Sequence, residues 1–150
     1  MAYVPARGSV GAMTSSAPSL PDRLATPVRA FMRPGVITVP EDASLLEAKR
    51  AMVRHGVHAV LVVSAEGGRP LGWVAASGLL EWLQRDLDAI PAARAITEPA
   101  RAIEPDATAQ EALTALARPG TSHLLVSPLS ERTPHGVVAP MDLIDLVTRP

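Results

Sequence analysis

Two stretches of the sequence decide the fold: VITVPEDASLLEA at residues 36–48 and ARAIEPDATAQEA at residues 100–112. They open two copies of one unit, because residues 36–83 align without a gap on residues 100–147 at an offset of 64. Fourteen aligned pairs are identical, among them Asp42/Asp106, Glu47/Glu111, Gly56/Gly120, Gly72/Gly136 and Leu79/Leu143. An internal repeat of this kind predicts two units of the same topology in one chain.

The local pattern of each copy predicts the order strand, helix, strand, strand, helix. Ser44 with Glu47, and Thr108 with Glu111, form capping boxes in which the hydroxyl accepts from a backbone N–H and the glutamate reaches back. We expect Gly56 and Gly120 to end these helices, since glycine adopts positive φ at little cost. Predicted strands are 36–39, 59–63 and 71–74 in the first copy, and 100–103, 123–126 and 135–138 in the second.

A last helix is predicted to begin near Ser77 in the first copy and near Pro140 in the second, with Ser77 as a capping residue. One unit of this length is too small to bury both faces of a sheet by itself, so the two copies should pack together. The prediction is an α/β (α+β) fold of two β-α-β-β-α units related by a pseudo-two-fold axis. The cleft between the units is the expected place for a small ligand.

The repeat also predicts the division of the chain. Residues 1–21 are rich in Ala, Ser, Gly and Pro, and we expect a flexible tail there; an arm onto a partner chain, resting on Tyr3 and Val4, is the alternative. Residues 22–90 are expected to form the first unit with a leading helix through Leu24, Val28, Phe31 and Met32. Residues 91–150 are expected to form the second unit.

Composition excludes several classes of protein. Fourteen Lys and Arg against 15 Asp and Glu leave a net charge of −1, which disfavours nucleic acid and anionic membranes as partners. The absence of cysteine rules out disulfides and thiolate sites, and no apolar run is long enough for a membrane span. We therefore expect a soluble cytoplasmic protein. With no nucleophile elbow, phosphate loop or complete metal-ligand set (His55 and His58 lack further ligands), we expect no enzyme, catalytic residue, metal or obligatory cofactor.

The two copies resemble the tandem cystathionine-β-synthase (CBS) domain pair, or Bateman module. The resemblance covers residues 28–148 and rests on the entry from Phe31 to Val63 and on the closing motifs GWVAASGLL (72–80) and GVVAPMDLI (136–144). It implies a regulatory module whose cleft binds an adenosine-type ligand such as AMP, ADP, ATP or S-adenosylmethionine. It also implies side-by-side association into a homodimer and an effector protein that the sequence does not name.

The resemblance implies that Asp142 accepts hydrogen bonds from the ribose hydroxyls, because it stands at the acidic position of the second closing motif. Its repeat partner is Gly78, so we expect one ligand per chain. Ala139, Pro140 and Met141 would provide backbone and apolar walls, with Ala102, Ser122 and His123 near the adenine and Arg101 near the phosphates. Ala75 and Ala139 stand where the family has a hydroxyl residue, which disfavours phosphate contacts.

Two alternatives remain open from the residues alone. Asp142, beside Pro140 in a first helical turn, is also a common stabilising pattern without any ligand. A ligand-independent dimerisation or protein-interaction module with a degenerate nucleotide site is therefore the second functional hypothesis. Trp73 and Trp82 face Val137 and Leu146 in the alignment; they either fill the core or, where exposed, contribute to a dimer contact.

Overall fold

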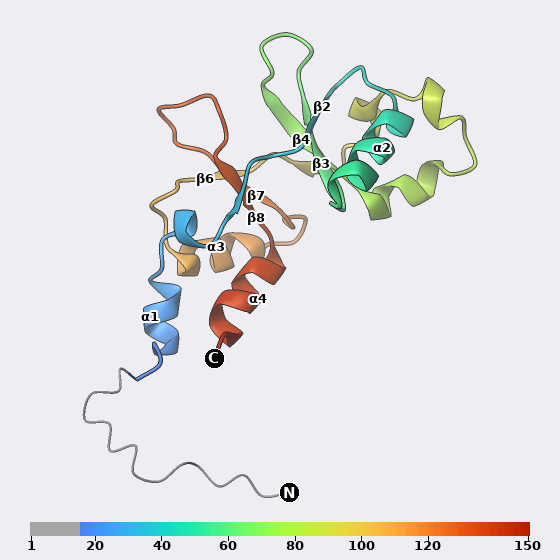
Figure 1. The fold of residues 1–150 in the computed structure, drawn as a ribbon. Coiled ribbons are helices and arrows are strands. Elements are labelled where there is room, and N and C mark those ends of the chain that lie inside the picture. Colours follow the sequence, from blue (N-terminus) through green and yellow to red (C-terminus); the bar gives the residue numbers. More distant parts are fainter. Residues whose placement is uncertain (1–15) are drawn as a thin grey trace, which may run out of the picture.

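The computed structural model describes residues 16–150 and shows two four-stranded sheets with helices packed on them (Figure 1). The predicted α+β fold of two repeated units is confirmed. The predicted tail falls mostly on residues 1–15, which lie outside the described residues, as do Tyr3 and Val4. Residues 20 and 21, assigned to that tail, already belong to the helix α1 (Leu20–Leu24).

The two sheets have corresponding strand orders. One sheet runs β2-β3-β4-β5, made by Thr38–Pro40, Ala59–Val63, Pro70–Ala75 and Glu98–Pro99. The other runs β6-β7-β8-β1, made by Ala102–Ile103, Leu124–Val126, Gly136–Val138 and Arg33–Pro34. In both, the first strand pairs parallel with the second and the remaining pairs are antiparallel.

The first long helix of each unit begins as the sequence predicts. In α2 (Leu45–His55) the Ser44 hydroxyl accepts from the Glu47 N–H at 3.1 Å, and in α3 (Ala109–Leu116) Thr108 accepts from Glu111 at 3.2 Å. Gly56 ends α2 at a φ of 63°. The prediction for Gly120 is wrong: its φ is positive, but α3 ends at Leu116. Pro119 explains the early end, because the residue before a proline avoids the helical conformation.

The closing helices differ between the units. The second unit ends in the α-helix α4 (Pro140–Thr148), whereas the first has a 3₁₀ helix, η2 (Ala76–Trp82). Ala75 is the residue that precedes η2 and Ser77 lies inside it, so the prediction that Ser77 caps this helix is wrong. The 3₁₀ form has poorer hydrogen-bond geometry than an α-helix.

The predicted leading helix is interrupted. It divides into α1 and the 3₁₀ turn η1 (Val28–Ala30), with Pro27 in an extended conformation between them. Proline has no N–H to donate to a helical hydrogen bond, which accounts for the break.

Each leading segment packs on the other unit, not on the unit that follows it in the chain. Val28 is fully buried in the core of the second unit, and its N–H donates to the Ala107 carbonyl at 2.7 Å. Its repeat partner Ala92, in the 3₁₀ turn η4 (Ala92–Ala95), is fully buried in the core of the first unit and donates to Ala43 at 2.6 Å. The strands β1 and β5 complete the exchange, since β1 joins the second sheet and β5 the first. Figure 1 shows α1 beside α3 and α4 in the same arrangement.

A third apolar cluster joins the two sheets. Leu61, Trp73 and Leu125 form its buried centre, with Val36, Ala59, Val63, Ala100 and Val137 packed around them. Leu61 and Leu125 are repeat partners, and so are Trp73 and Val137, so equivalent faces of the two units meet. Trp73 fills the core, while Trp82 is partly buried against the first core with Arg85 and Arg94 over its ring.

Candidate functional site

The candidate site lies where β8 ends and α4 begins. The chain turns there from the buried Val138 through Ala139 into Pro140, whose fixed φ suits the first helical position. Asp142 follows in the first turn, and its Oδ2 accepts from the Ala139 N–H at 2.8 Å. The carboxylate therefore stabilises the end of the helix that carries unsatisfied N–H groups and a partial positive charge.

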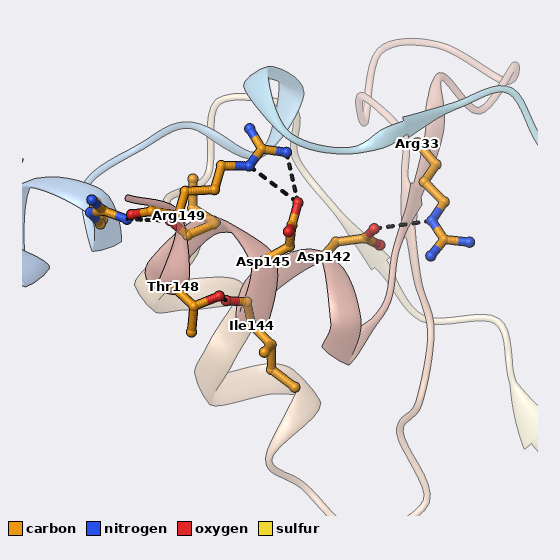
Figure 2. A network of polar contacts seen from close by, with 8 residues as sticks. Arg33, Asp142, Ile144, Asp145, Thr148 and Arg149 are labelled. Atoms are coloured by element: carbon orange, nitrogen blue, oxygen red, sulfur yellow. Dashed lines mark hydrogen bonds and ion pairs between the residues drawn. The ribbon is translucent and has the colours of Figure 1, made fainter. Parts of the chain in front are cut away.

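The other oxygen of Asp142 binds a residue from β1. The Arg33 Nε donates to Asp142 Oδ1 at 3.0 Å, and Figure 2 shows the guanidinium reaching the carboxylate from a segment far away in the sequence. The Asp142 side chain is 10% exposed, whereas that of Arg33 is 63% exposed. A mostly buried acceptor is thus covered by a cation that can move into solvent.

The corresponding position in the first unit has no side chain. Gly78 is the repeat partner of Asp142, and a Cβ built there would meet nothing closer than the Thr97 Cγ2 at 3.5 Å. The space would accept a methyl group but holds no acceptor. The asymmetry expected from the sequence is therefore present in the fold.

The structure brings some predicted residues together and separates others. Leu124 pairs with Val138, which places His123 and Ala139 at the adjoining ends of β7 and β8. Ala102 lies on β6, on the other side of β7, where it pairs with Leu125. Arg101 is exposed and contributes its carbonyl to the Leu125 N–H, while Met141 is exposed on α4.

Ser122 and His123 are bound to a residue that the sequence analysis missed. The Glu98 carboxylate on β5 accepts from both of their backbone N–H groups, at 2.7 and 3.0 Å, and from the Ser122 hydroxyl. The His123 ring stacks on Trp73 of the first unit, with 4.9 Å between the ring centroids. Burial lowers the pKa of His123 below its ordinary value, while the nearby Glu98 and Asp142 charges oppose this effect and Arg33 adds to it.

Arg33 and Glu98 share a signal that the sequence contains. Each is a charged residue directly before a proline, in Arg33-Pro34 and Glu98-Pro99. A residue before proline adopts an extended backbone, which suits a short edge strand. The offset between these dipeptides is one residue longer than that of the repeat, so the alignment alone does not pair them.

Comparison with known proteins agrees with this geometry. Residues 28–85 match the model of the CBS domain family, and the second unit repeats that topology. The first unit therefore matches the CBS family, and the chain as a whole has the fold of CBS-domain structures. No curated protein sequence matches the chain.

Solved structures of CBS domains share the fold. The CBS domain of the bacterial CNNM/CorC family Mg²⁺ transporter is 24% identical, with 83% of this chain and 77% of that chain covered and a TM-score of 0.73. A structure of that domain in complex with ATP is 23% identical, with 83% and 89% covered and a TM-score of 0.72. A CBS domain protein from Pyrobaculum aerophilum complexed with AMP is 18% identical, with 83% and 100% covered and a TM-score of 0.70.

Two further findings concern residues 16–150. None of their helices has the length and apolar character needed to cross a membrane. Within the same range, no three His, Cys, Asp or Glu side chains are grouped as metal ligands would be.

Proposed function

We propose that this CBS pair is a regulatory module that binds one adenosine-type ligand per chain, with Asp142 as the acceptor for the ribose hydroxyls. The observation that carries the proposal is the state of the Asp142 carboxylate. One oxygen is fixed by the Ala139 N–H, and the other is covered by the exposed Arg33. A ribose diol could take the place of this guanidinium without leaving a buried donor unpaired.

The binding of AMP and of ATP by two proteins of the same fold supports the choice of ligand class. The N–H groups at the start of α4 and the positive end of that helix favour a ligand with negative charge. Because Gly78 provides no carboxylate, the first unit lacks the equivalent acceptor. The proposed stoichiometry of one ligand per chain follows from this difference between Asp142 and Gly78.

Regulation follows from the exchanged segments and requires no catalytic group. Arg33 lies on β1, which leads directly into the first unit but is hydrogen-bonded to β8 of the second. A ligand that displaces Arg33 therefore changes a contact between the units. It can bias their packing only by the difference in its affinity for the two arrangements.

Thermal unfolding with AMP, ADP, ATP, S-adenosylmethionine and adenosine tests this proposal. A ligand at a hundred times its dissociation constant adds about 2.7 kcal/mol of stability, which corresponds to a rise in melting temperature of roughly 5 to 10 °C. Asp142→Ala and Asp142→Asn should remove most of this ligand-induced rise. Gly78→Ala is the matched control and should preserve it, since the new methyl group meets only ordinary contacts.

The quantity to compare is the ligand-induced rise, because Asp142→Ala also removes the hydrogen bond to Ala139 and lowers the melting temperature by itself. Asp142→Asn keeps an oxygen for that N–H and loses the charge and the second acceptor oxygen, which binds Arg33. A flat response of the unmodified protein to every ligand would contradict the proposal. An equal loss in the Gly78→Ala and Asp142→Ala proteins would contradict the single site.

Exposed apolar side chains on the helices favour a second candidate, a dimerisation or protein-interaction module without a ligand. Leu80, Leu83 and Val53 of the first unit are 68%, 60% and 69% exposed, and Val53 also lines a hollow of about 310 Å³ together with Met52 and Leu79. Met141 and Ile144 provide a smaller apolar area on α4. Apolar groups of this size are typical of contact surfaces, and a homodimer through these helices is the proposed assembly.

Light scattering of the full chain tests the second candidate. A dimer that Leu80→Lys converts to a monomer, without a change in far-UV circular dichroism, would support association through η2. A monomer at high concentration would contradict it. Leu129→Lys, at an exposed apolar residue on the loop between β7 and β8, is the matched control and should leave the mass unchanged.

A further inference from the structure

Glu98 is the one charged residue among residues 16–150 that is buried, with 8% of its surface exposed. It reaches the second unit from β5, a strand of the first sheet. Its carboxylate accepts from the Ser122 N–H at 2.7 Å, from the His123 N–H at 3.0 Å and from the Ser122 hydroxyl. Burying a carboxylate is costly, and this set of donors offsets the cost.

These donors form a receptor for an oxyanion. Two consecutive backbone N–H groups and one hydroxyl converge on a single carboxyl group, in the manner of backbone concavities that bind anions. The Ser122 hydroxyl also lies 2.9 Å from His123 Nδ1. The Glu98 carboxylate accepts from all three donors. The chain itself therefore occupies the place of an oxyanion.

Residues beside this receptor have unused hydrogen-bonding atoms. Trp73 Nε1 and Thr121 Oγ1 are buried without a partner in the part of the chain that the structure describes. Trp73 pairs with Glu98 across β4 and β5 and stacks on His123, and Thr121 directly precedes Ser122. A buried polar atom without a partner is costly, which makes both atoms candidates for a further bond when the local arrangement changes.

The other exchanged strand shows what is particular to Glu98. Glu98 stands opposite Trp73 in one sheet and Arg33 stands opposite Val137 in the other. Trp73 and Val137 are repeat partners. Arg33 and Glu98 therefore hold corresponding positions in the two sheets, with opposite charges. Arg33 is exposed and covers an acid, whereas Glu98 is buried and fills a set of donors.

We propose that the N–H groups of Ser122 and His123 with the Ser122 hydroxyl are an oxyanion-binding position, and that Glu98 is its internal ligand. An external phosphate or carboxylate binds there only after the Glu98 side chain has left. Glu98 thereby excludes anions from these donors. The inference does not require a ligand at Asp142, because it concerns the donors at the start of β7 and the carboxylate that they bind.

Chemical rescue of Glu98→Ala tests the proposal in the full chain. The variant leaves the donors unpaired and should melt well below the unmodified protein. Sodium acetate or inorganic phosphate at about 100 mM should then raise its melting temperature by about 3 °C or more, relative to sodium chloride of equal ionic strength. A response to acetate identifies a carboxylate site and a response to phosphate a phosphate site, and either supports the proposal.

Two proteins serve as controls. The unmodified protein should show no such rise, because Glu98 already occupies the position. Glu104→Ala is the matched variant: Glu104 accepts from the Leu129 N–H at 2.7 Å on the exposed loop between β7 and β8. Water can satisfy that N–H once the carboxylate is gone, so neither anion should rescue this variant.

Absence of rescue by both anions in folded Glu98→Ala overturns the proposal, and so does an equal rise in the Glu104→Ala protein. If Glu98→Ala does not fold in chloride, the measurement becomes refolding from urea. Folding in acetate or phosphate but not in chloride then supports the internal-ligand role. Failure to fold in all three salts overturns it.

Discussion

The strands β1 and β5 occupy corresponding places in the two sheets but carry opposite charges. Both have two residues, both consist of a charged residue followed by proline, and both join the sheet of the other unit. On β1 the charge is Arg33, which lies mostly in solvent. On β5 the charge is Glu98, which is buried and bonded to three donors. The two strands thus place one charge mostly in solvent and bury the other among hydrogen-bond donors.

The largest expected effect comes from separating an exchanged strand from its sheet. A Cβ on Gly136 would lie 2.3 Å from the Arg33 carbonyl oxygen, and a Cβ on Gly72 would lie 2.7 Å from the Glu98 carbonyl oxygen. Gly136→Ala and Gly72→Ala should each lower the free energy of unfolding by about 3 kcal/mol, measured by urea denaturation, because backbone cannot move away as a flexible side chain does. Gly78→Ala, where a Cβ would meet only ordinary contacts, should change it by less than about 0.5 kcal/mol. Loss of stability in Gly78→Ala alone would contradict this assignment of close contacts.

The charged residues of the two strands should differ in the cost of their removal. Glu98→Gln replaces three hydrogen bonds to a charged acceptor with weaker neutral ones and puts an amide NH2 opposite the Ser122 hydroxyl, which should cost about 2 kcal/mol in urea denaturation. Stability equal to that of the unmodified protein would show that the carboxylate is not needed at this place.

The contacts around Glu98 and His123 should also make the stability of the protein depend on pH. Because burial lowers the pKa of His123, the unfolded chain takes up this proton first as the pH falls through about 6.5. The contribution of His123 to stability is therefore present above that pH and is lost as the pH falls towards the lower pKa of the folded state. Glu98 and Asp142 oppose this loss, while Arg33 adds to it. Melting temperatures from pH 5 to 8 should fall less steeply for His123→Gln, and an unchanged slope would contradict the assignment.

The smallest effect on stability is expected for the removal of Arg33. Arg33→Gln removes an ion pair whose cation is mostly in solvent, so the free energy of unfolding should change by less than about 1 kcal/mol. The change should be smaller still in high salt, since salt screens exposed charges. If Arg33→Gln lowered the free energy of unfolding as much as Glu98→Gln does, the account of an exposed charge on β1 and a buried charge on β5 would be contradicted.

Much of this fold could be predicted from the sequence because its signals are local. The capping boxes at Ser44 and Thr108 use residues three positions apart, and the apolar strands follow from short runs of branched residues. The repeat then relates the two halves. The family resemblance placed Asp142 at the cleft, and its hydrogen bond to Ala139 is the local capping alternative that the sequence also allowed.

The exchanged strands could not be predicted in the same way. Arg33 meets Asp142 across 109 residues, and two-residue strands have no periodicity. Glu98 is polar and precedes a proline, features typical of an exposed turn, yet burial of its carboxylate depends on Ser122 and His123, which approach it only in the folded chain. The 3₁₀ form of η2 likewise follows from packing, since its residues resemble those of α4.

Isothermal titration calorimetry of AMP, with ATP in parallel, tests most directly the claim that Asp142 gives the second unit a ligand site that Gly78 denies to the first. We expect one site per chain in the unmodified protein and in Gly78→Ala, and none in Asp142→Ala. Two equivalent sites per chain, or one site that persists in Asp142→Ala, would contradict the account.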